Sequence, residues 1–324
     1  MKRILIIQTA FIGDVILATA LIESVRGCLP DVKIDFVLRK GNESLLANNP
    51  HLDKIIIWNK QGGKYKGLVH TIREIRKQRY DLVINLQRYA SSGFMVLRSK
   101  SNQKIGYSNN PLSFCFSKKL KHELNSGKHE IERNLNLAKL SLPELTLHKP
   151  KLFPAPEDAV SVAIYLQQKP YVVMAPASVW YTKQLPVSKW VELIQKQPAQ
   201  RQVFLVGAPG DHQLIDEIIK KSNQPHIINL AGKLSLNATA LLMHGAEMNY
   251  VNDSAPLHLT SAMNAPVTAF FCSTIPSFGF GPLASQATIV ETPTPLDCRP
   301  CGVHGFKACP KGHFACGNQI VINP

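Results

Sequence analysis

Acidic residues are scarce in this sequence. Its 324 residues include 22 Asp and Glu against 37 Lys and Arg, which gives a formal net charge of +15. An excess of this size favours a partner that carries negative charge: a nucleic acid, an anionic membrane surface or a phosphorylated substrate. The alternative is a soluble basic protein without such a partner, because many proteins are simply basic.

Long apolar runs are also missing. No stretch approaches the roughly 18–20 apolar residues of a membrane-spanning helix, and the first apolar run, Ile4 to Ile7, is interrupted by Gln8 and Thr9. That run is too short for a secretory signal peptide. We therefore expect a cytoplasmic protein, which can still act peripherally at a membrane surface. With 45% hydrophobic and 18% charged residues the composition is globular, and the length suffices for two domains.

A second Cys-x2-Cys pair is absent from the cysteine-rich end of the chain. Four of the seven cysteines fall within 19 residues: Cys298, Cys301, Cys309 and Cys316. Four sulfurs would suit tetrahedral zinc, but with a single pair we expect reduced, packed cysteines and no metal. A zinc site and a disulfide or reversible thiol pair are the alternatives. The odd total argues against a full disulfide framework in a cytoplasmic chain.

Strand and helix signals alternate along the first half of the chain. Apolar or β-rich runs that predict strands cover 4–7, 33–39, 54–58, 81–86 and 104–107. Helical spacing of apolar residues covers 14–27 and 68–78, and Gly27 stands where the first of these helices should end. Strands separated by helices indicate crossover connections and therefore a parallel sheet.

The second half repeats this pattern after a proline-rich stretch. Predicted strands cover 171–176, 202–207, 226–232, 248–253 and 266–272, the last being the final strand. Predicted helices cover 157–169, 188–197, 212–222, 237–246 and 255–263. Ser188 is the expected N-cap of the second of these helices. We expect two doubly wound α/β domains, residues 1–160 and 161–324, with a cleft between them and ligands at the carboxyl ends of the strands.

The turn after the first strand lacks the glycines of a phosphate loop. Residues 10–23 read AFIGDVILATALIE, with Gly13 alone and Asp14 directly after it. A phosphate-binding turn needs glycines and free backbone N–H groups, and a carboxylate there would repel the phosphate. The pattern therefore indicates another role for Asp14. We expect the dipole of the helix that follows to hold this carboxylate ionised and to temper its basicity.

The strongest local signal is VNDSAPLHLTSAM at 251–263. A strand ends at Asp253, and Ser254 and Ala255 open a helix. The free N–H groups and the dipole of that helix would favour an anion such as a diphosphate. The alternative is structural, with Asp253 or Ser254 as an N-cap only and His258 as a satisfied helix residue.

Two weaker signals accompany it. Lys183 lies in the loop after the predicted strand at 171–176, where a lysine can pair with a diphosphate as a point charge; a solvated loop lysine is the alternative. The stretch VGAPGDH at 206–212 has two glycines in a close turn, and Asp211 could accept a ribose hydroxyl. Turn chemistry alone also explains that stretch.

A set of motifs occurs in a specific order along the chain. FIGDVILATALI near the start, KQLPVSKW in the middle, then VFLVGAPGD, NLAGKLSL, NDSAPLHL and PVTAFFCST together resemble the ADP-heptose:lipopolysaccharide heptosyltransferases, glycosyltransferase family 9. The terminal LDCRPCGVHGFKACPKGHFACGNQI is similar to the tail of the heptosyltransferase II branch. The resemblance runs from residue 1 to the end of the chain.

The resemblance implies a GT-B fold, in which two Rossmann-like domains face each other across a cleft. It implies transfer of heptose from ADP-heptose to the lipopolysaccharide inner core, with inversion and without an obligatory metal or other cofactor. The first domain would bind the acceptor and the second the nucleotide-sugar. By the same resemblance Asp14 is the catalytic base, and Lys183 acts at the diphosphate. The donor-binding positions are Ser178, Lys183, Asp211, Gly232, Asp253, Ser254, Ala255 and His258, and the acceptor-side positions are Thr9 and Gly13.

Two positions depart from the family pattern. Ala255 stands where glycine is frequent, and its methyl group hinders the approach of a phosphate to the backbone slightly. Gln87 stands where an acid or a histidine is common, which weakens any role for that loop in acceptor binding.

Two other functions are the alternatives. The same architecture could use another nucleotide-sugar, since contacts to the base cannot be read from the sequence. The basic residues could instead belong to a nucleic-acid module, in which they would interleave with aromatics. The basic runs, including 98–104 and 118–122, lie mainly in the first half. This favours a phosphorylated lipopolysaccharide acceptor at the inner-membrane surface, and we expect no nucleic-acid partner.

Overall fold

The computed structural model describes residues 1–61, 63–124, 126–167 and 170–323. The chain divides into two compact units, Met1–Phe153 (unit 1) and Pro154–Pro324 (unit 2). The sequence placed this division after residue 160, which would cut helix α5 (Pro156–Leu166). That helix packs on α8 of unit 2, so it belongs with the second unit. No helix in the described ranges is long and apolar enough to cross a membrane.

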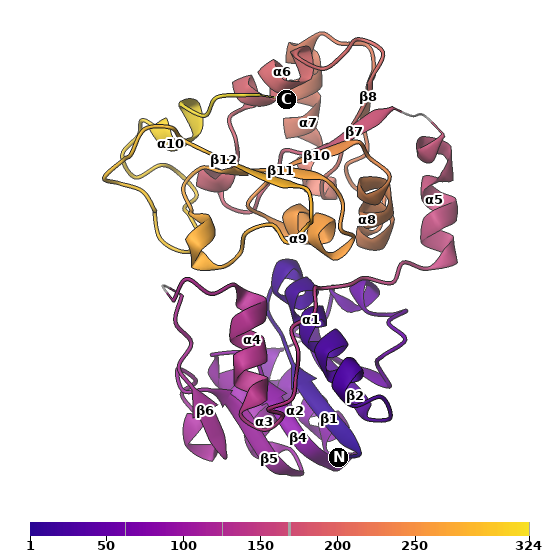
Figure 1. Cartoon of the computed structure of the whole chain (residues 1–324), viewed down its shortest axis with the longest axis vertical. Helices are drawn as coiled ribbons and strands as arrows, with labels where there is room; N and C mark the ends of the chain where they lie inside the picture. The colour runs from indigo at the N-terminus through magenta and orange to yellow at the C-terminus, as the bar shows by residue number, and fades with distance from the viewer. Residues whose placement is uncertain (62, 125, 168–169, 324) are drawn as a thin grey trace. The chain divides into compact units, whose positions relative to one another are not determined.

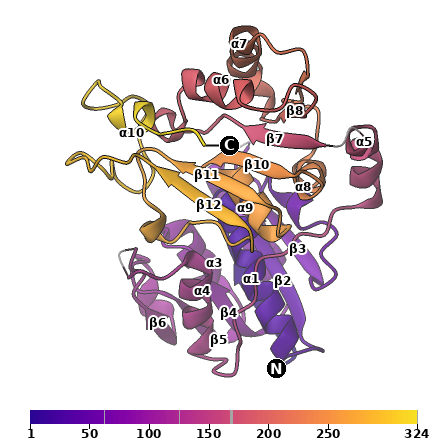
Figure 2. The same ribbon diagram turned by 45° about the horizontal axis from the view of Figure 1, so that its top comes forward.

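Unit 1 is built on a parallel sheet with the strand order β3-β2-β1-β4-β5-β6 (Figures 1 and 2). Its strands are β1 (Arg3–Ile7), β2 (Lys33–Arg39), β3 (Lys54–Trp58), β4 (Tyr80–Asn85), β5 (Ser101–Tyr107) and β6 (Lys118–Leu120). Its helices are α1 (Ile12–Cys28), α2 (Lys64–Ile75), α3 (Ala90–Arg98) and α4 (Glu130–Lys139), with short 3-10 turns η1 (Glu43–Leu45) and η2 (Ser113–Cys115). Helix α1 packs against α4, and α2 packs against α3. The two pairs therefore cover opposite faces of the sheet (Figure 1).

Unit 2 repeats the arrangement with the order β12-β11-β10-β7-β8-β9. Its strands are β7 (Tyr171–Ala175), β8 (Gln202–Leu205), β9 (Ile227–Asn229), β10 (Met248–Asn252), β11 (Val267–Phe271) and β12 (Ala287–Glu291). Besides α5, its helices are α6 (Val187–Gln195), α7 (His212–Ser222), α8 (Leu236–His244), α9 (Ala255–Ala262) and α10 (Ala315–Asn318), with 3-10 turns η3 (Tyr181–Lys183), η4 (Pro209–Asp211) and η5 (Pro276–Phe278). Helices α6 and α7 pack together on one face, and α5, α8 and α9 on the other (Figure 2).

The strands form where the sequence has continuous apolar runs, because a parallel sheet is covered on both faces. Ile4 to Ile7 of β1 and Tyr171 to Ala175 of β7 are buried along their whole length. In unit 2, Trp190 of α6 packs edge-on against Phe270 of β11, with ring centroids 5.6 Å apart. The central strands are thereby fixed, and the loops at their carboxyl ends are held in place for a site.

The structure corrects several local predictions. Helix α1 continues through Gly27 to Cys28, so this glycine does not end it. Helix α6 begins at Val187 with Pro186 as its N-cap, so Ser188 lies inside the helix. Strand β12 follows the strand expected to be the last. Helices α3 and α4 and strand β6 were not expected from the sequence. Of the helix expected over 157–169, residues 168 and 169 lie outside the described residues.

Candidate functional site

The centre of the unit 2 site is a cluster of three polar side chains. The Nζ atom of Lys183 lies 2.6 Å from the Oδ2 atom of Asp253. The same carboxylate oxygen accepts a hydrogen bond of 2.6 Å from the Thr274 hydroxyl. Lysine and aspartate are both largely buried, with side chains 14% and 7% exposed. The sequence predicted the lysine and the aspartate separately, but gave no signal for Thr274.

This cluster lies at the point where the strand order of the second sheet reverses. From β7 the chain runs outward through β8 and β9, and it then returns to place β10 on the other side of β7. Asp253 directly follows β10, and Lys183 lies in η3, in the connection after β7. In open α/β sheets, the crevice at the carboxyl ends of two such strands is the usual ligand site.

Asn252 joins the two connections. Its side-chain oxygen accepts from the Leu185 backbone N–H at 2.9 Å, and its amide nitrogen donates to the Pro176 carbonyl at 2.8 Å. The residue is fully buried. The loop that carries Lys183 is thus fixed to the end of β10 by two hydrogen bonds, a function that sequence reasoning missed.

Helix α9 starts immediately after Asp253. Ser254 is the N-cap residue and has an extended backbone conformation. Its hydroxyl lies 3.5 Å from the Asn252 carbonyl oxygen and forms no capping hydrogen bond with a backbone N–H of the helix. Ala255 and Pro256 form the first turn, where proline takes away no hydrogen bond that the helix needs. His258 lies one turn further and is buried. The half-buried start of the helix directs its positive end toward the same edge of the sheet.

The remaining donor-side positions belong to two loops. Ser178 is half-buried, and its carbonyl accepts from the Gln184 side chain at 2.6 Å. The Asp211 carboxylate accepts a hydrogen bond of 2.7 Å from the Ala208 backbone N–H. One of its oxygens therefore stabilises the turn η4, to which Asp211 itself belongs. Gly232 donates to the Gly207 carbonyl at 2.9 Å.

Only glycine fits comfortably at position 232. Its φ is +68°, and a Cβ atom would approach the Cα of Pro209 to 2.9 Å. The positive φ and this close approach both exclude a side chain there.

Unit 1 carries Asp14 at the corresponding edge of its own sheet. The residue lies in the first turn of α1, after the carboxyl end of β1, and its side chain is half-buried. Burial, followed by the negative charge of Glu130, raises the pKa of the Asp14 carboxyl to about 6. Backbone N–H groups of Phe11 and Asp14 at the helix start oppose this rise of the pKa. The helix start thus tempers the basicity of Asp14 in the expected direction, but burial outweighs the helix terminus, and the net pKa is raised.

Glu130 belongs to a buried charged triad at the start of α4. Its Oε2 atom lies 3.1 Å from His122 Nε2 and 2.8 Å from Arg133 Nε, and all three side chains are almost fully buried. Burial raises the pKa of Glu130, but hydrogen bonds and charges from His122 and Arg133 outweigh it, and the pKa lies below its usual value. Glu130 therefore remains a negative charge near Asp14. The sequence gave no sign of this triad.

The predicted acceptor-side positions lie around the turn between β1 and α1. Thr9 is buried and Gly13 half-buried. The Gln8 side-chain oxygen accepts from the Gln87 amide and from the Ala10 N–H, the latter at 3.2 Å. Gln87 therefore connects the ends of β1 and β4 at the reversal point of the first sheet.

The four clustered cysteines are all free thiols. The Cys301 thiol donates to the Cys298 carbonyl at 3.1 Å, and Cys298 Sγ lies 4.0 Å from His313 Nε2. Burial, followed by the neighbouring thiols Cys301, Cys309 and Cys298, raises the pKa of Cys316 to about 11. Among the described residues, no three His, Cys, Asp or Glu side chains form a group that could hold a metal ion.

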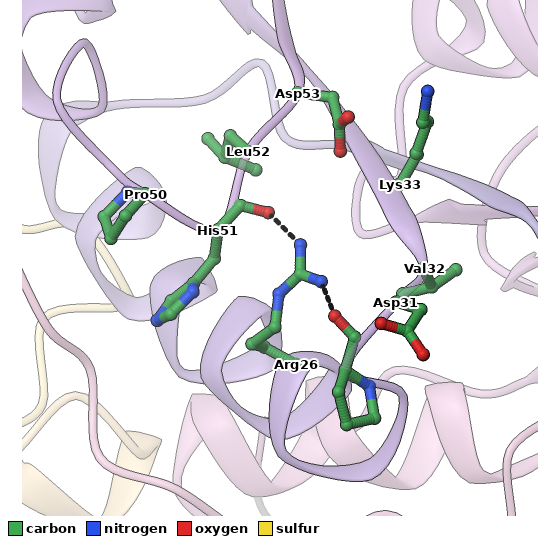
Figure 3. A pocket seen from close by; sticks show the side chains of 9 residues that line it. Arg26, Asp31, Val32, Lys33, Pro50, His51, Leu52 and Asp53 are labelled. Carbon is green, nitrogen blue, oxygen red and sulfur yellow. Dashed lines mark hydrogen bonds between the residues drawn. The ribbon is translucent and has the colours of Figure 1, made fainter.

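A shallow pocket of about 460 Å³ lies at the opposite end of the first sheet (Figure 3). It is lined by Arg26, Pro30, Asp31, Val32, Lys33, Pro50, His51, Leu52 and Asp53. The Arg26 guanidinium donates to the carbonyls of Pro30 and His51, the latter at 2.8 Å. The arginine thus binds the chain's own backbone, and the pocket brings together none of the predicted site residues.

The family model and the curated relatives point to the same family. The model of glycosyltransferase family 9 (heptosyltransferase) matches residues 68–307. Lipopolysaccharide heptosyltransferase 3 of Escherichia coli K12 is 29% identical over 283 residues, which cover 81% of this chain and 80% of that protein.

Solved structures share the fold, among them two E. coli heptosyltransferases. E. coli ADP-heptose lps heptosyltransferase II superposes with a TM-score of 0.78 at 21% identity, covering 93% of this chain and 96% of that one. E. coli heptosyltransferase WaaC with ADP-2-deoxy-2-fluoro heptose gives a TM-score of 0.71 at 19% identity, over 90% and 93%. The predicted fold class, two Rossmann-like doubly wound units of the GT-B type, is confirmed.

The matched range contains every predicted donor-side residue, whereas Asp14 precedes it. Since the match covers well over half of the sequence, this protein belongs to glycosyltransferase family 9, the heptosyltransferase family.

Proposed function

We propose that this glycosyltransferase moves heptose from ADP-heptose to a hydroxyl of the lipopolysaccharide inner core, with inversion at the anomeric carbon. Its relatives are named lipopolysaccharide heptosyltransferases, and one structural neighbour contains an ADP-heptose analogue. Unit 2 binds the donor, and unit 1 binds the acceptor at the inner-membrane surface.

One observation carries the donor assignment: Lys183 and the start of α9 meet at the reversal point of the second sheet. A lysine held by Asp253 at 2.6 Å is a fixed cation, and the α9 start adds the positive end of a helix dipole. Both are suited to the negative charge that builds on a departing diphosphate, and this electrostatic contribution is often the largest in catalysis.

Asp14 is the general base in this proposal. The acceptor hydroxyl oxygen attacks the anomeric carbon, the bond from that carbon to the diphosphate oxygen breaks, and the hydroxyl proton passes to the Asp14 carboxylate. With a pKa of about 6, Asp14 is mostly ionised at neutral pH and is a better base than an exposed aspartate. The leaving ADP carries away the electron pair.

The test is a panel of nucleotides and nucleotide-sugars. Thermal unfolding of the purified protein is followed with ADP, UDP, GDP and ADP-heptose, and heptose transfer to inner-core acceptors is measured with each donor. ADP at a hundred times its dissociation constant should stabilise the protein by about 2.7 kcal/mol, and UDP should have little effect. Protection by UDP or GDP but not ADP would assign another donor. Retention of single-stranded nucleic acid at physiological salt would contradict the absence of a nucleic-acid partner.

A further inference from the structure

The C-terminal segment that contains the cysteines also contacts the Lys183 turn. Residues 299–306, here called the tail strap, run beside the end of β11 and return to η3. Figures 1 and 2 show this part of the chain, between β12 and α10, at the β12 side of the second sheet.

The strap forms hydrogen bonds with both sides of the Lys183 turn. The Thr182 backbone N–H donates to the Phe306 carbonyl at 3.1 Å, and the Phe306 N–H donates to the Thr182 hydroxyl at 2.8 Å. The Thr182 carbonyl accepts from the Ser273 N–H at 3.2 Å, and the Ser273 carbonyl accepts from the Cys301 N–H at 2.8 Å. Thr182 is therefore held between the strap and the loop after β11.

A 3-10 turn of three residues has little stability of its own, because its few internal hydrogen bonds have poor geometry. In η3 the Lys183 N–H donates to the Trp180 carbonyl at 3.0 Å, so the turn is closed locally. The position of the turn relative to Asp253 depends on its neighbours. The strap supplies two of the hydrogen bonds that fix Thr182, the residue before Lys183.

Arg299 anchors the first residue of the strap. Its guanidinium donates to the carbonyls of Cys272 at 2.6 Å, Phe271 at 3.1 Å and Thr274 at 2.7 Å, and it also pairs with Glu291. Thr274 in turn donates to the carboxylate that holds Lys183. The arginine thus fixes the backbone of both residues that flank Ser273.

At Gly305 the strap lies so close to the Lys183 turn that a side chain would not fit between them. Its φ is +74°, and a Cβ atom would lie 2.8 Å from Thr182 Oγ1, 3.1 Å from Ser273 Oγ and 3.2 Å from Lys183 Cγ. Gly312 has the same φ of +74°, but a Cβ atom there would meet nothing within 4 Å. The two glycines share the same φ, and they differ in what a Cβ atom would meet.

We propose that the tail strap is a positioning element of the donor site, in which Gly305 and the Phe306 backbone hold Thr182 so that Lys183 points to Asp253 and to the donor diphosphate. This inference rests on the proposed role of Lys183. The strap itself touches no reacting atom. Its function is to keep the cation in place before and during departure of the diphosphate.

The first test compares Gly305→Ala with Gly312→Ala. Both variants carry the strain of an alanine at positive φ, so any difference reports the contact with the Lys183 turn. We expect Gly305→Ala to raise the KM for ADP-heptose about tenfold and to reduce protection by ADP, which corresponds to roughly one lost hydrogen bond. Gly312→Ala should stay within about twofold of the wild type. Equal kinetics of the two variants would overturn the proposal.

A second pair decides the question if Gly305→Ala does not fold. Thr182→Ser keeps the hydroxyl that accepts from Phe306, whereas Thr182→Val keeps the shape and removes it. We expect the serine variant to retain wild-type donor KM, and the valine variant to show the same rise as Gly305→Ala. A valine variant with lowered thermal stability but unchanged donor KM and kcat would reduce the strap to a structural role and overturn the proposal.

Failure of the proposed donor gives a different result. If the wild-type protein transfers sugar from another nucleotide-sugar and not from ADP-heptose, the donor assignment is wrong. The same comparison of variants, made with that donor, then still decides whether the strap positions Lys183.

Discussion

The two units share one topology and differ sharply in charge. Each has a central strand from which the chain runs outward and then returns on the other side. Residues 1–153 contain 26 Lys and Arg against 12 Asp and Glu, a formal charge of +14, whereas residues 154–324 contain 11 against 10, a charge of +1. Nearly all of the positive charge thus belongs to the proposed acceptor unit, where a phosphorylated lipopolysaccharide core would bind.

The local charge at the two reversal points does not follow the net charge of the units. In the nearly neutral unit 2, the carboxylate of Asp253 has a cation at 2.6 Å. In the strongly basic unit 1, Asp14 has the carboxylate of Glu130 nearby, and its pKa is raised to about 6. The same scaffold therefore holds a buried ion pair in unit 2 and a carboxyl of raised pKa in unit 1. The chemistry depends on a few side chains at the strand ends and not on the fold.

The largest expected effect tests whether Asp14 is the proton acceptor. Asp14→Asn keeps the size of the side chain and removes its basicity, so turnover should fall by about 10²- to 10⁴-fold. ADP protection against thermal unfolding should stay nearly unchanged, since the donor residues belong to unit 2. The control is Asp31→Asn, an exposed acid of the same unit. Near-wild-type turnover in Asp14→Asn would remove the proposed contrast between the two reversal points.

The next largest effect is expected for Lys183→Ala, which tests whether the lysine of unit 2 stabilises the leaving group. Lys183→Ala removes the charge at the proposed leaving group and leaves Asp253 with the Thr274 hydroxyl. We expect a loss of about 10²- to 10³-fold in kcat/KM for the donor, the range seen when one group that stabilises transition-state charge is removed. ADP protection should also decrease. Lys220→Ala, at an exposed position of α7, serves as the control, and an equal loss in both variants would contradict a specific role.

The sequence predicted the strands of the two sheets and individual candidate site residues. It did not predict the contacts between those residues. Central strands such as β1 and β7 are continuous apolar runs, and such runs are readable. Strand β12 is largely exposed at a sheet edge and gives a weaker signal. Helix α4 is rich in charge, although its capping box of His129 and Glu132 was a signal that could have predicted its start.

The contacts within the site could not be predicted because they join residues that lie far apart in the sequence. Lys183 and Asp253 were each predicted, but their pairing joins two loops far apart in the sequence. No sequence pattern marks Gly305, which the structure places against Thr182. The raised pKa of Asp14 depends on burial and on Glu130 of α4. These properties arise from tertiary packing, and no local pattern encodes them.

A smaller effect is expected on the free energy of unfolding, and it tests whether the pKa of Asp14 is raised in unit 1. The pKa of Asp14 is about 6 in the folded protein against an ordinary value of 3.8. The ionised carboxylate therefore costs stability above pH 6, and this cost is relieved as the pH falls through 6 toward 3.8. Asn carries no such charge, so Asp14→Asn should be more stable than the wild type at pH 8, by about 1–3 kcal/mol. Thermal unfolding at pH 8 and pH 5 should show a smaller gain at pH 5, and a gain independent of pH would contradict the raised pKa.

The smallest expected effect on activity isolates the charge of Glu130. Glu130→Gln removes the nearby negative charge but keeps a side chain of the same size, so the pKa of Asp14 should fall and the acid limb of the kcat/KM–pH profile should move to lower pH. The movement should be modest, because burial is the larger cause of the raised pKa. Removing one partner also leaves His122 and Arg133 buried without their carboxylate, at a cost of about 3–5 kcal/mol. Glu132→Gln, which weakens the capping box two residues away, is the control for damage to α4. An acid limb that moves equally in both variants would mean that packing of α4, and not the charge of Glu130, sets the basicity of Asp14.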